Sequence, residues 1–288
     1  MSMPDENWSV DIKPRGRGVH IDFKELWRYR DLIYLLARRT FVAVYKQTVL
    51  GPAWAILQPL LTTGIFTVVF GMLVGIKTEG PSAFLFYMCG SVPWNFFARC
   101  LEKTSQTFRD NERLFGKVYF PRLCAPIATV LVTLINFAIQ GAFFLLILSG
   151  GQLFGAFTVT PAWTLVALTP LVVLLMGCLG LGAGIAVSAL TVRYKDLSLL
   201  VSFGVSLWMY ISPVAYPASA LSDKYPALRT LFMLNPMTPV IEFFRAAFLG
   251  TGSFDPIWLL ASAGMTAVIF AVGLMLFGRV EKTFADVI

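Results

Sequence analysis

The sequence contains few charged residues, and long stretches of it contain none. Asp, Glu, Lys and Arg together make up 14% of the chain, whereas a soluble domain carries roughly 25%. So few charges do not cover a globular surface, which excludes a soluble enzyme domain and a disordered chain. No Asp, Glu, Lys, Arg or His occurs in 47–76, 80–98, 123–192, 197–222 or 256–278.

Residue types that carry enzyme chemistry are also scarce. The single histidine, His20, lies in a polar segment, so a histidine-based triad within a membrane is excluded. The four cysteines form no CxxC pair, and the uncharged stretches offer no carboxylates, so we expect no metal site. The absence of a carboxylate in mid-span also argues against a proton-coupled carrier.

No nucleotide-binding loop is present. The sequence lacks GxxxxGK[ST], the loop that holds the phosphates of ATP in P-loop proteins. We therefore expect no catalytic residue and no cofactor in this chain. Transport, if this chain performs it, needs an energy source from another chain.

The uncharged stretches predict an all-α integral membrane protein with six transmembrane helices in a domain of residues 47–288. A helix crosses the bilayer with about 20 apolar residues. The stretch 123–192 is too long for one helix, and Gly150, Gly151 and Pro161 predict a turn inside it. The predicted spans are about 52–76, 84–98, 123–149, 161–192, 197–216 and 256–278.

The basic residues lie almost entirely on one side of this arrangement. With six spans, 19 of the 23 Lys and Arg fall in residues 1–51, 99–122, 193–195 and the C-terminal tail. The positive-inside rule then places both termini in the cytoplasm. Because the basic residues are divided among four segments, we expect membrane lipids and not nucleic acid as their partners.

Two segments precede the first span. Residues 1–20 are polar and resemble a flexible tail. Residues 21–46 alternate apolar and basic positions at helical spacing, which is typical of a helix on the inner membrane surface. A helix packed on a partner protein is the alternative. Arg38, Arg39 and Lys46 are candidates for binding lipid phosphate, and general attachment to anionic lipid is the alternative.

The segment 99–122 is the most polar connection between predicted spans. It holds a charged run followed by apolar residues, a pattern suited to docking into a groove of a partner protein. A solvated connector is the alternative. The candidate contact residues are Arg109, Asp110, Asn111, Glu112, Arg113, Leu114 and Phe115.

Other residues are candidates for lining a channel or a gate. Asn136 and Gln140 share one helix face and must face protein or water in a membrane; hydrogen bonding between helices is the alternative. Prolines interrupt 217–250, so we expect two half-helices that enter the outer leaflet and return. The tryptophans at span ends suit either interfacial belts or stacking on sugar rings. The remaining candidates are Trp94, Trp208, Tyr210, Pro213, Asn235, Glu242 and Arg245.

Small residues recur at intervals of four in the predicted span 161–192. Gly180, Gly184 and Ser188 form this ladder, which permits two helices to approach closely. We expect a structural contact there.

Short motifs follow one another in a fixed order over about residues 22–280. They are YKQT at 45–48, LGP at 50–52, QP at 58–59, KVYFPR at 117–122, VRYKD at 192–196, SP at 212–213, YP at 216–217 and NPM at 235–237, followed by Glu242 and Arg245. This ordered set resembles the ABC-2 type permeases of polysaccharide export, and O-antigen export permeases are the most similar. Lys195 stands where that family more often has Arg, which keeps the charge.

The resemblance implies a function and partners. The chain would be the transmembrane subunit of an ATP-driven exporter that moves lipid-linked polysaccharide, such as O antigen, capsule or teichoic acid, across the bacterial inner membrane. It would form a homodimer with two ATP-binding cassette subunits, which would hold ATP and Mg. The resemblance also implies that 22–45 contacts the ATPase, that 99–120 contains the coupling helix, and that 217–250 forms outer gate helices.

Two other functions are open at this point. An ABC-2 exporter of drugs or small lipids would share the architecture. A membrane-embedded glycan-synthesis enzyme or assembly factor would need an acid, base or metal cluster at the membrane face, and the sequence offers none.

Overall fold

The computed structural model describes residues 23–46, 48, 50–115, 120–191, 196–220 and 229–287. All regular structure within these ranges is helical, and they contain no strand. The predicted all-α class is therefore confirmed. The motif segments around 117–119 and 192–195, and the polar tail 1–20, lie outside the described residues.

Four helical segments of the described chain are long and apolar enough to cross a membrane. This makes the chain a multi-pass membrane protein. The segments are α3 with the following π-helical turns (Trp54–Leu73), α7 (Cys124–Leu153), α8 (Trp163–Thr191) and the Pro256–Val280 part of α13, which runs from Pro256 to Val287. The predicted spans 84–98 and 197–216 correspond to α4 (Ala83–Ser105) and the short apolar helix α9 (Leu197–Ile211).

Helix α4 forms the centre of the bundle. Its residues from Leu85 to Trp94 are all buried, and it packs against α3, α7, α8 and α9. Helix α4 contains Tyr87, Pro93 and Asn95, which are uncommon in a helix that faces lipid. The neighbouring helices cover these positions of α4 and separate them from lipid. The helix also continues to Ser105, beyond the predicted end of the span at 98.

Helix α8 lies unusually close to two neighbours. A Cβ added to Gly184 would lie 2.6 Å from Thr104 Cβ of α4, and one added to Gly180 would lie 2.6 Å from Cys100 Cβ. On the other side of α8, a Cβ at Gly182 would lie 2.6 Å from Phe270 Cα of α13. Only glycine fits at these distances, as the small-residue ladder predicts.

The N-terminal amphipathic segment consists of two helices. The predicted helix 21–46 is divided at Tyr29 into α1 (Phe23–Arg28) and α2 (Arg30–Tyr45). One face of α2 packs Ile33, Leu36 and Ala37 against α7, while large apolar side chains such as Trp27 and Tyr34 are exposed.

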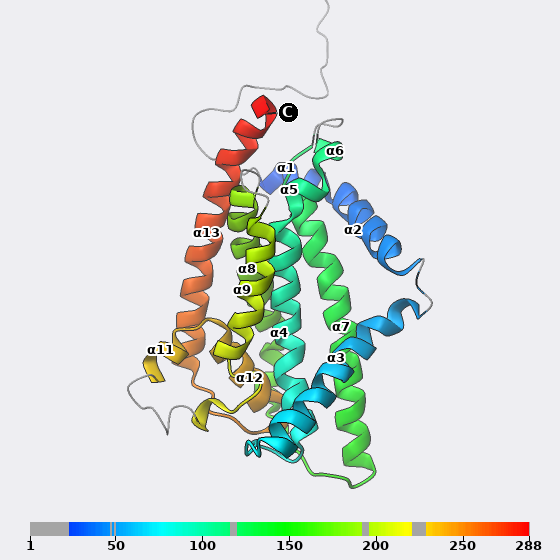
Figure 1. The fold of residues 1–288 in the computed structure, drawn as a ribbon, viewed down its shortest axis with the longest axis vertical. Helices are drawn as coiled ribbons and strands as arrows, with labels where there is room; N and C mark the ends of the chain where they lie inside the picture. The colour runs from blue at the N-terminus through cyan, green and yellow to red at the C-terminus, as the bar shows by residue number, and fades with distance from the viewer. Residues whose placement is uncertain are drawn as a thin grey trace, which may run out of the picture.

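The two ends of the bundle differ. The short helices α5 (Thr107–Asp110) and α6 (Glu112–Phe115) lie at the same end as the C-terminus of α13 (Figure 1). Helices α11 (Arg229–Met233) and α12 (Met237–Leu249) lie at the opposite end, and neither is long enough to cross the bundle (Figure 1). The predicted coupling loop and the predicted outer region are thus at opposite ends.

Candidate functional site

A cavity of about 1040 Å³ opens between α2, α4, α5 and α7. We call it the basic cavity, because four of the side chains that line it are basic and two are acidic. Its apolar wall comes from α7, including Ala125, Ala128 and Val132. The charged residues that line it are Arg39, Arg99, Glu102, Lys103, Arg109 and Asp110.

The positive charge of the basic cavity is only partly balanced. Arg109 Nε lies 3.8 Å from Asp110 Oδ1 in an exposed pair, which contributes little to stability. Among the described residues, no carboxylate lies within ion-pair distance of Arg39, Arg99 or Lys103. Glu102 of the lining interacts electrostatically with Arg99 and Lys103 from beyond ion-pair distance, and the four cations of the lining still outnumber its two carboxylates.

Two hydrogen bonds join the elements around the cavity. Arg99 Nη2 of α4 donates to Gln58 Oε1 of α3 at 2.6 Å, and the Tyr45 hydroxyl of α2 donates to Asn136 Oδ1 of α7. Burial raises the pKa of the Tyr45 phenol, while the charge of Arg99 and the bond to Asn136 act in the opposite direction. The phenol is therefore neutral near pH 7 and can donate this bond. Gln140 is buried one turn further along α7 and lies outside the cavity lining.

The structure separates the three lipid-phosphate candidates. All three side chains are exposed, and Arg39 lines the basic cavity whereas Arg38 and Lys46 lie outside its lining. Neighbouring arginines of one helix thus face different surroundings.

The coupling candidates divide in a similar way. Arg109, Asp110, Asn111 and Leu114 line the basic cavity. Phe115 instead packs on aromatic rings, with its centroid 6.0 Å from Phe108 and 5.6 Å from Phe120. The side chains of Glu112 and Arg113 lie outside the described residues.

At the opposite end, Asn235 joins the end of α9 to the start of α12. Its Oδ1 accepts from Trp208 Nε1 at 3.1 Å and from the Met237 backbone N–H at 3.1 Å, and its Nδ2 donates to Ser212 Oγ at 2.9 Å. The Trp208 ring also meets the Trp94 ring edge to face at 6.3 Å. Three predicted gate residues, Trp94, Trp208 and Asn235, are therefore brought together.

Glu242 and Arg245 form a buried ion pair on α12. Arg245 Nη1 lies 2.7 Å from Glu242 Oε1, and the two side chains are 0% and 1% exposed. Arg245 Nη2 donates to the Pro213 carbonyl at 2.6 Å, and its guanidinium lies over the Phe86 ring at 3.7 Å. Glu242 Oε2 accepts from the Ser253 backbone N–H at 2.9 Å. In the single chain, this pair fastens α12 to α4 and to the segment after α9.

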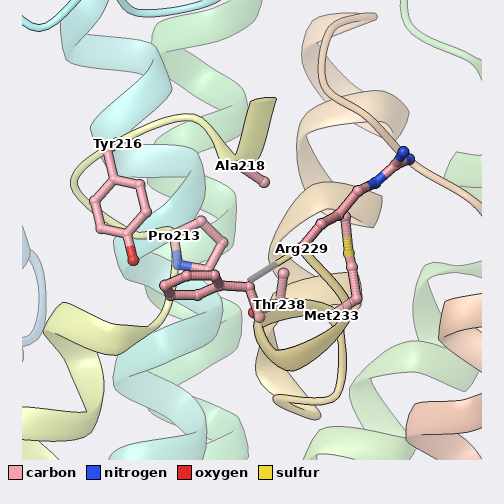
Figure 2. A pocket seen from close by; sticks show the side chains of 7 residues that line it. Pro213, Tyr216, Ala218, Arg229, Met233 and Thr238 are labelled. Atoms are coloured by element: carbon pink, nitrogen blue, oxygen red, sulfur yellow. The ribbon is translucent and has the colours of Figure 1, made fainter. Parts of the chain in front are cut away.

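Next to this pair is a cavity of about 10 Å³, the volume that one water needs. Figure 2 shows Pro213, Tyr216 and Ala218 on one side of it and Arg229 and Met233 of α11 on the other. Tyr210 does not line this cavity: its side chain is exposed, and its carbonyl accepts a hydrogen bond from the Tyr216 hydroxyl at 3.1 Å.

Sequence reasoning missed several residues that the structure places at these sites. Gln58 and Tyr45 appeared in the sequence only as parts of motifs, and Arg99 and Lys103 only as basic residues of the segment 99–122. The signal for Arg99 and Lys103 is their spacing, because residues four apart on a helix share a face.

The similarity to known proteins extends over most of the chain. Residues 31–249 match the family model described as ABC-2 type transporter. The chain belongs to the ABC-2 type transporter family.

Curated relatives of this ABC-2 protein cover nearly its whole length. It is 28% identical over 263 residues to the O-antigen export system permease protein RfbA of Myxococcus xanthus, which covers 91% of this chain and 97% of that protein. It is 25% identical over 259 residues to RfbA of Klebsiella pneumoniae, an alignment that covers 90% of this chain and 95% of that protein. It is 24% identical over 257 residues to the polysialic acid transport protein KpsM of Escherichia coli, an alignment that covers 88% of this chain and 93% of that protein.

Replacing Asn235 by alanine in this ABC-2 protein is expected to lower its free energy of unfolding by about 1–3 kcal/mol. The change leaves Trp208 Nε1 and the Met237 N–H without their acceptor. The measurement is the midpoint of thermal unfolding in detergent. Trp208→Phe, which removes one of these donors and keeps most of the ring, should have a smaller effect; equal midpoints for N235A and the unchanged protein would contradict the assigned role.

Proposed function

We propose that this chain is the transmembrane permease subunit of an ATP-driven exporter that moves lipid-linked polysaccharide of the O-antigen type across the bacterial inner membrane. The observation that carries the proposal is the near full-length similarity to two O-antigen export permeases and a polysialic acid transport protein. The bundle of apolar helices with a polar cavity at one end also suits this function.

The proposed membrane topology has six spans and two cytoplasmic termini. It counts α4 and α9 together with the four long apolar helices. It is supported by the distribution of basic residues and by the position of α5, α6 and the C-terminus at one end (Figure 1). In this topology α11 and α12 are outer gate helices, held to the bundle by Asn235 and by the Glu242–Arg245 pair.

The proposed assembly is a homodimer with two ATP-binding cassette subunits, which bind ATP and Mg and supply the energy. The passage would lie between the two permease chains, where Tyr210, exposed on α9, is a candidate lining residue. Asn136, Gln140, Trp94 and Trp208 are further candidates, and each of them is buried or half-buried in the single chain.

The coupling element would be α5 and α6, with α1 and α2 as a second contact for the ATPase. Helix α5 directly follows α4, and the Phe108 ring stacks on Phe277 of α13 at 4.8 Å. Arg109 Nη1 also donates to Ser198 Oγ of α9 at 3.4 Å. A displacement of α5 would therefore act on three helices together, as rigid-body tilting requires.

Charge reversal at the coupling element tests this assignment. We expect Arg109→Glu with Arg113→Glu to lower export and recovery of the ATPase subunit about tenfold or more, because opposed like charges cost several kcal/mol. The readout is surface polysaccharide together with copurification. Lys77→Glu, the same reversal in an exposed connection between α3 and α4, is the control; equal export by both variants and the unchanged protein would show that α5 and α6 do not couple.

Deletion of the chain in its host tests the function itself. We expect polysaccharide to be lost from the surface and retained inside the cell, with a P-loop ATPase recovered from mild-detergent purifications of the tagged chain. Normal surface polysaccharide with altered drug tolerance would favour the drug or small-lipid exporter. Loss of the polymer from both compartments, with activity in the absence of an ATPase, would favour the glycan-synthesis enzyme or assembly factor.

A further inference from the structure

The basic cavity combines charge and apolar surface in a way that suits one kind of ligand. Its cations come from α2, α4 and α5, and its apolar wall comes from Ala125, Ala128 and Val132 of α7. A soluble anion needs only the cations. A lipid with a charged headgroup needs both, because its chain must stay in an apolar environment while its headgroup is bound.

The position of the cavity favours a ligand that arrives in the membrane. Helix α2, which forms one wall, exposes the apolar side chains of Leu35 and Val42 outside the cavity lining, as a helix at the headgroup level of a bilayer does. Arg99 follows directly after the predicted span 84–98. The cations of the cavity therefore lie near the boundary between lipid and water, where lipid phosphates are found.

Arg99 is held in a geometry suited to phosphate. Its Nη2 donates to the neutral amide oxygen of Gln58 at 2.6 Å, which fixes the side chain without neutralising it. The side chain is half-buried, so its charge is less screened than that of a fully exposed arginine. A guanidinium presents its donors in a planar fork that matches phosphate oxygens.

Two further side chains of the lining contribute. Lys103, one helical turn after Arg99, adds a second cation on the same face of α4. The Thr107 hydroxyl lines the cavity, is 2% exposed as a residue, and has no hydrogen-bond partner within the described part of the chain. An unpartnered buried hydroxyl costs free energy, which a bound phosphate oxygen would recover.

The lining also contains two carboxylates, whose negative charge opposes the binding of an anion. Asp110 is paired with Arg109, and Glu102 interacts electrostatically with both Arg99 and Lys103 from beyond ion-pair distance. The three cations without an ion pair outnumber the one remaining carboxylate, so the net field of the cavity favours an anion.

We propose that the basic cavity binds the phosphate or diphosphate headgroup of a membrane lipid, with Arg99, Lys103 and Arg39 as the binding cations. The proposal rests on the proposed function, since the lipid would be the anchor of the exported polymer. The volume of about 1040 Å³ holds a diphosphate together with the first sugar, because pockets for small molecules are typically about 300–1,000 Å³.

The test measures binding of a long-chain polyprenyl diphosphate to the full-length protein, purified with its copurifying subunits in nanodiscs of phosphatidylcholine. We expect Arg99→Gln with Lys103→Gln to weaken binding at least tenfold, and Arg99→Lys to retain part of it. Arg28→Gln is the matched control, because Arg28 is an exposed arginine of α1 outside the cavity lining and its loss should leave binding unchanged. Equal binding by the double variant and the unchanged protein, at equal thermal midpoints, would overturn the proposal.

Two comparison ligands identify the source of the phosphate. The uncharged polyprenol should bind at least tenfold more weakly than the diphosphate, and equal binding would overturn headgroup recognition. Inorganic diphosphate should compete only weakly, and competition as strong as that of the lipid would assign the cavity to a free anion. If the protein binds the lipid but surface polysaccharide is normal after gene deletion, the proposed exporter function is wrong and the proposed lipid-binding site is still supported.

Discussion

Replacing Arg245 by methionine is expected to destabilise the protein by about 3–5 kcal/mol, because it leaves the buried Glu242 carboxylate without its partner. The same change removes the donor to the Pro213 carbonyl and the cation over the Phe86 ring. The measurement is the midpoint of denaturation in detergent, together with the amount of protein recovered from the membrane.

A second variant separates the cost of the unpaired Glu242 charge from the cost of losing the other contacts of the Arg245 side chain. Arg245→Met combined with Glu242→Leu removes both charges, so it should recover part of the loss, although the Pro213 carbonyl and the Ser253 N–H still lack their partners. Arg229→Met is the control, since Arg229 is an exposed arginine of the neighbouring helix α11 (Figure 2) and should change stability by less than about 0.5 kcal/mol. An Arg245→Met protein as stable as this control would show that the pair does not fasten α12.

Much of the fold could be predicted from where charges are absent. Each uncharged stretch contains a helix, since backbone groups in lipid must be satisfied within the segment. Hydropathy could not show that α4 is the central helix, because a span surrounded by protein needs less apolar surface than one surrounded by lipid. The break at Tyr29 was also not predicted, since the apolar face of 21–46 continues across it.

The sites were less accessible to sequence reasoning than the fold. Glu242 and Arg245 were candidates for a gate from the sequence, but Pro213 and Phe86, which Arg245 contacts, are distant from it in the sequence. The basic cavity forms only where α2, α4, α5 and α7 converge. The sequence pattern of the helix 21–46 alone selects Arg38 and Arg39 together. The packing of α2 on α7 places Arg39, and not Arg38, in the cavity lining.

The glycine ladder of α8 gives the second large expected effect. Gly184→Ala should lower the free energy of unfolding by about 1–3 kcal/mol, because overpacking a close contact forces helices apart. The new Cβ would lie 2.9 Å from the Leu101 carbonyl oxygen as well as 2.6 Å from Thr104 Cβ, so backbone and not only a side chain would have to move. Gly180→Ala should act in the same direction, since its Cβ would lie 3.1 Å from the Phe97 carbonyl oxygen.

The matched control lies in a neighbouring helix. Gly141 of α7 has no atom within 4 Å of an added Cβ, so Gly141→Ala should be neutral or should stabilise by up to about 1 kcal/mol through helix propensity. Thermal midpoints of the Gly184→Ala and Gly141→Ala proteins in the same detergent give the comparison. Because α4 directly precedes α5, a shift of α4 away from α8 should also reduce export more than the loss of stability alone. Equal midpoints for the two variants would mean that α4 and α8 tolerate separation, and that their close contact does not hold the bundle together.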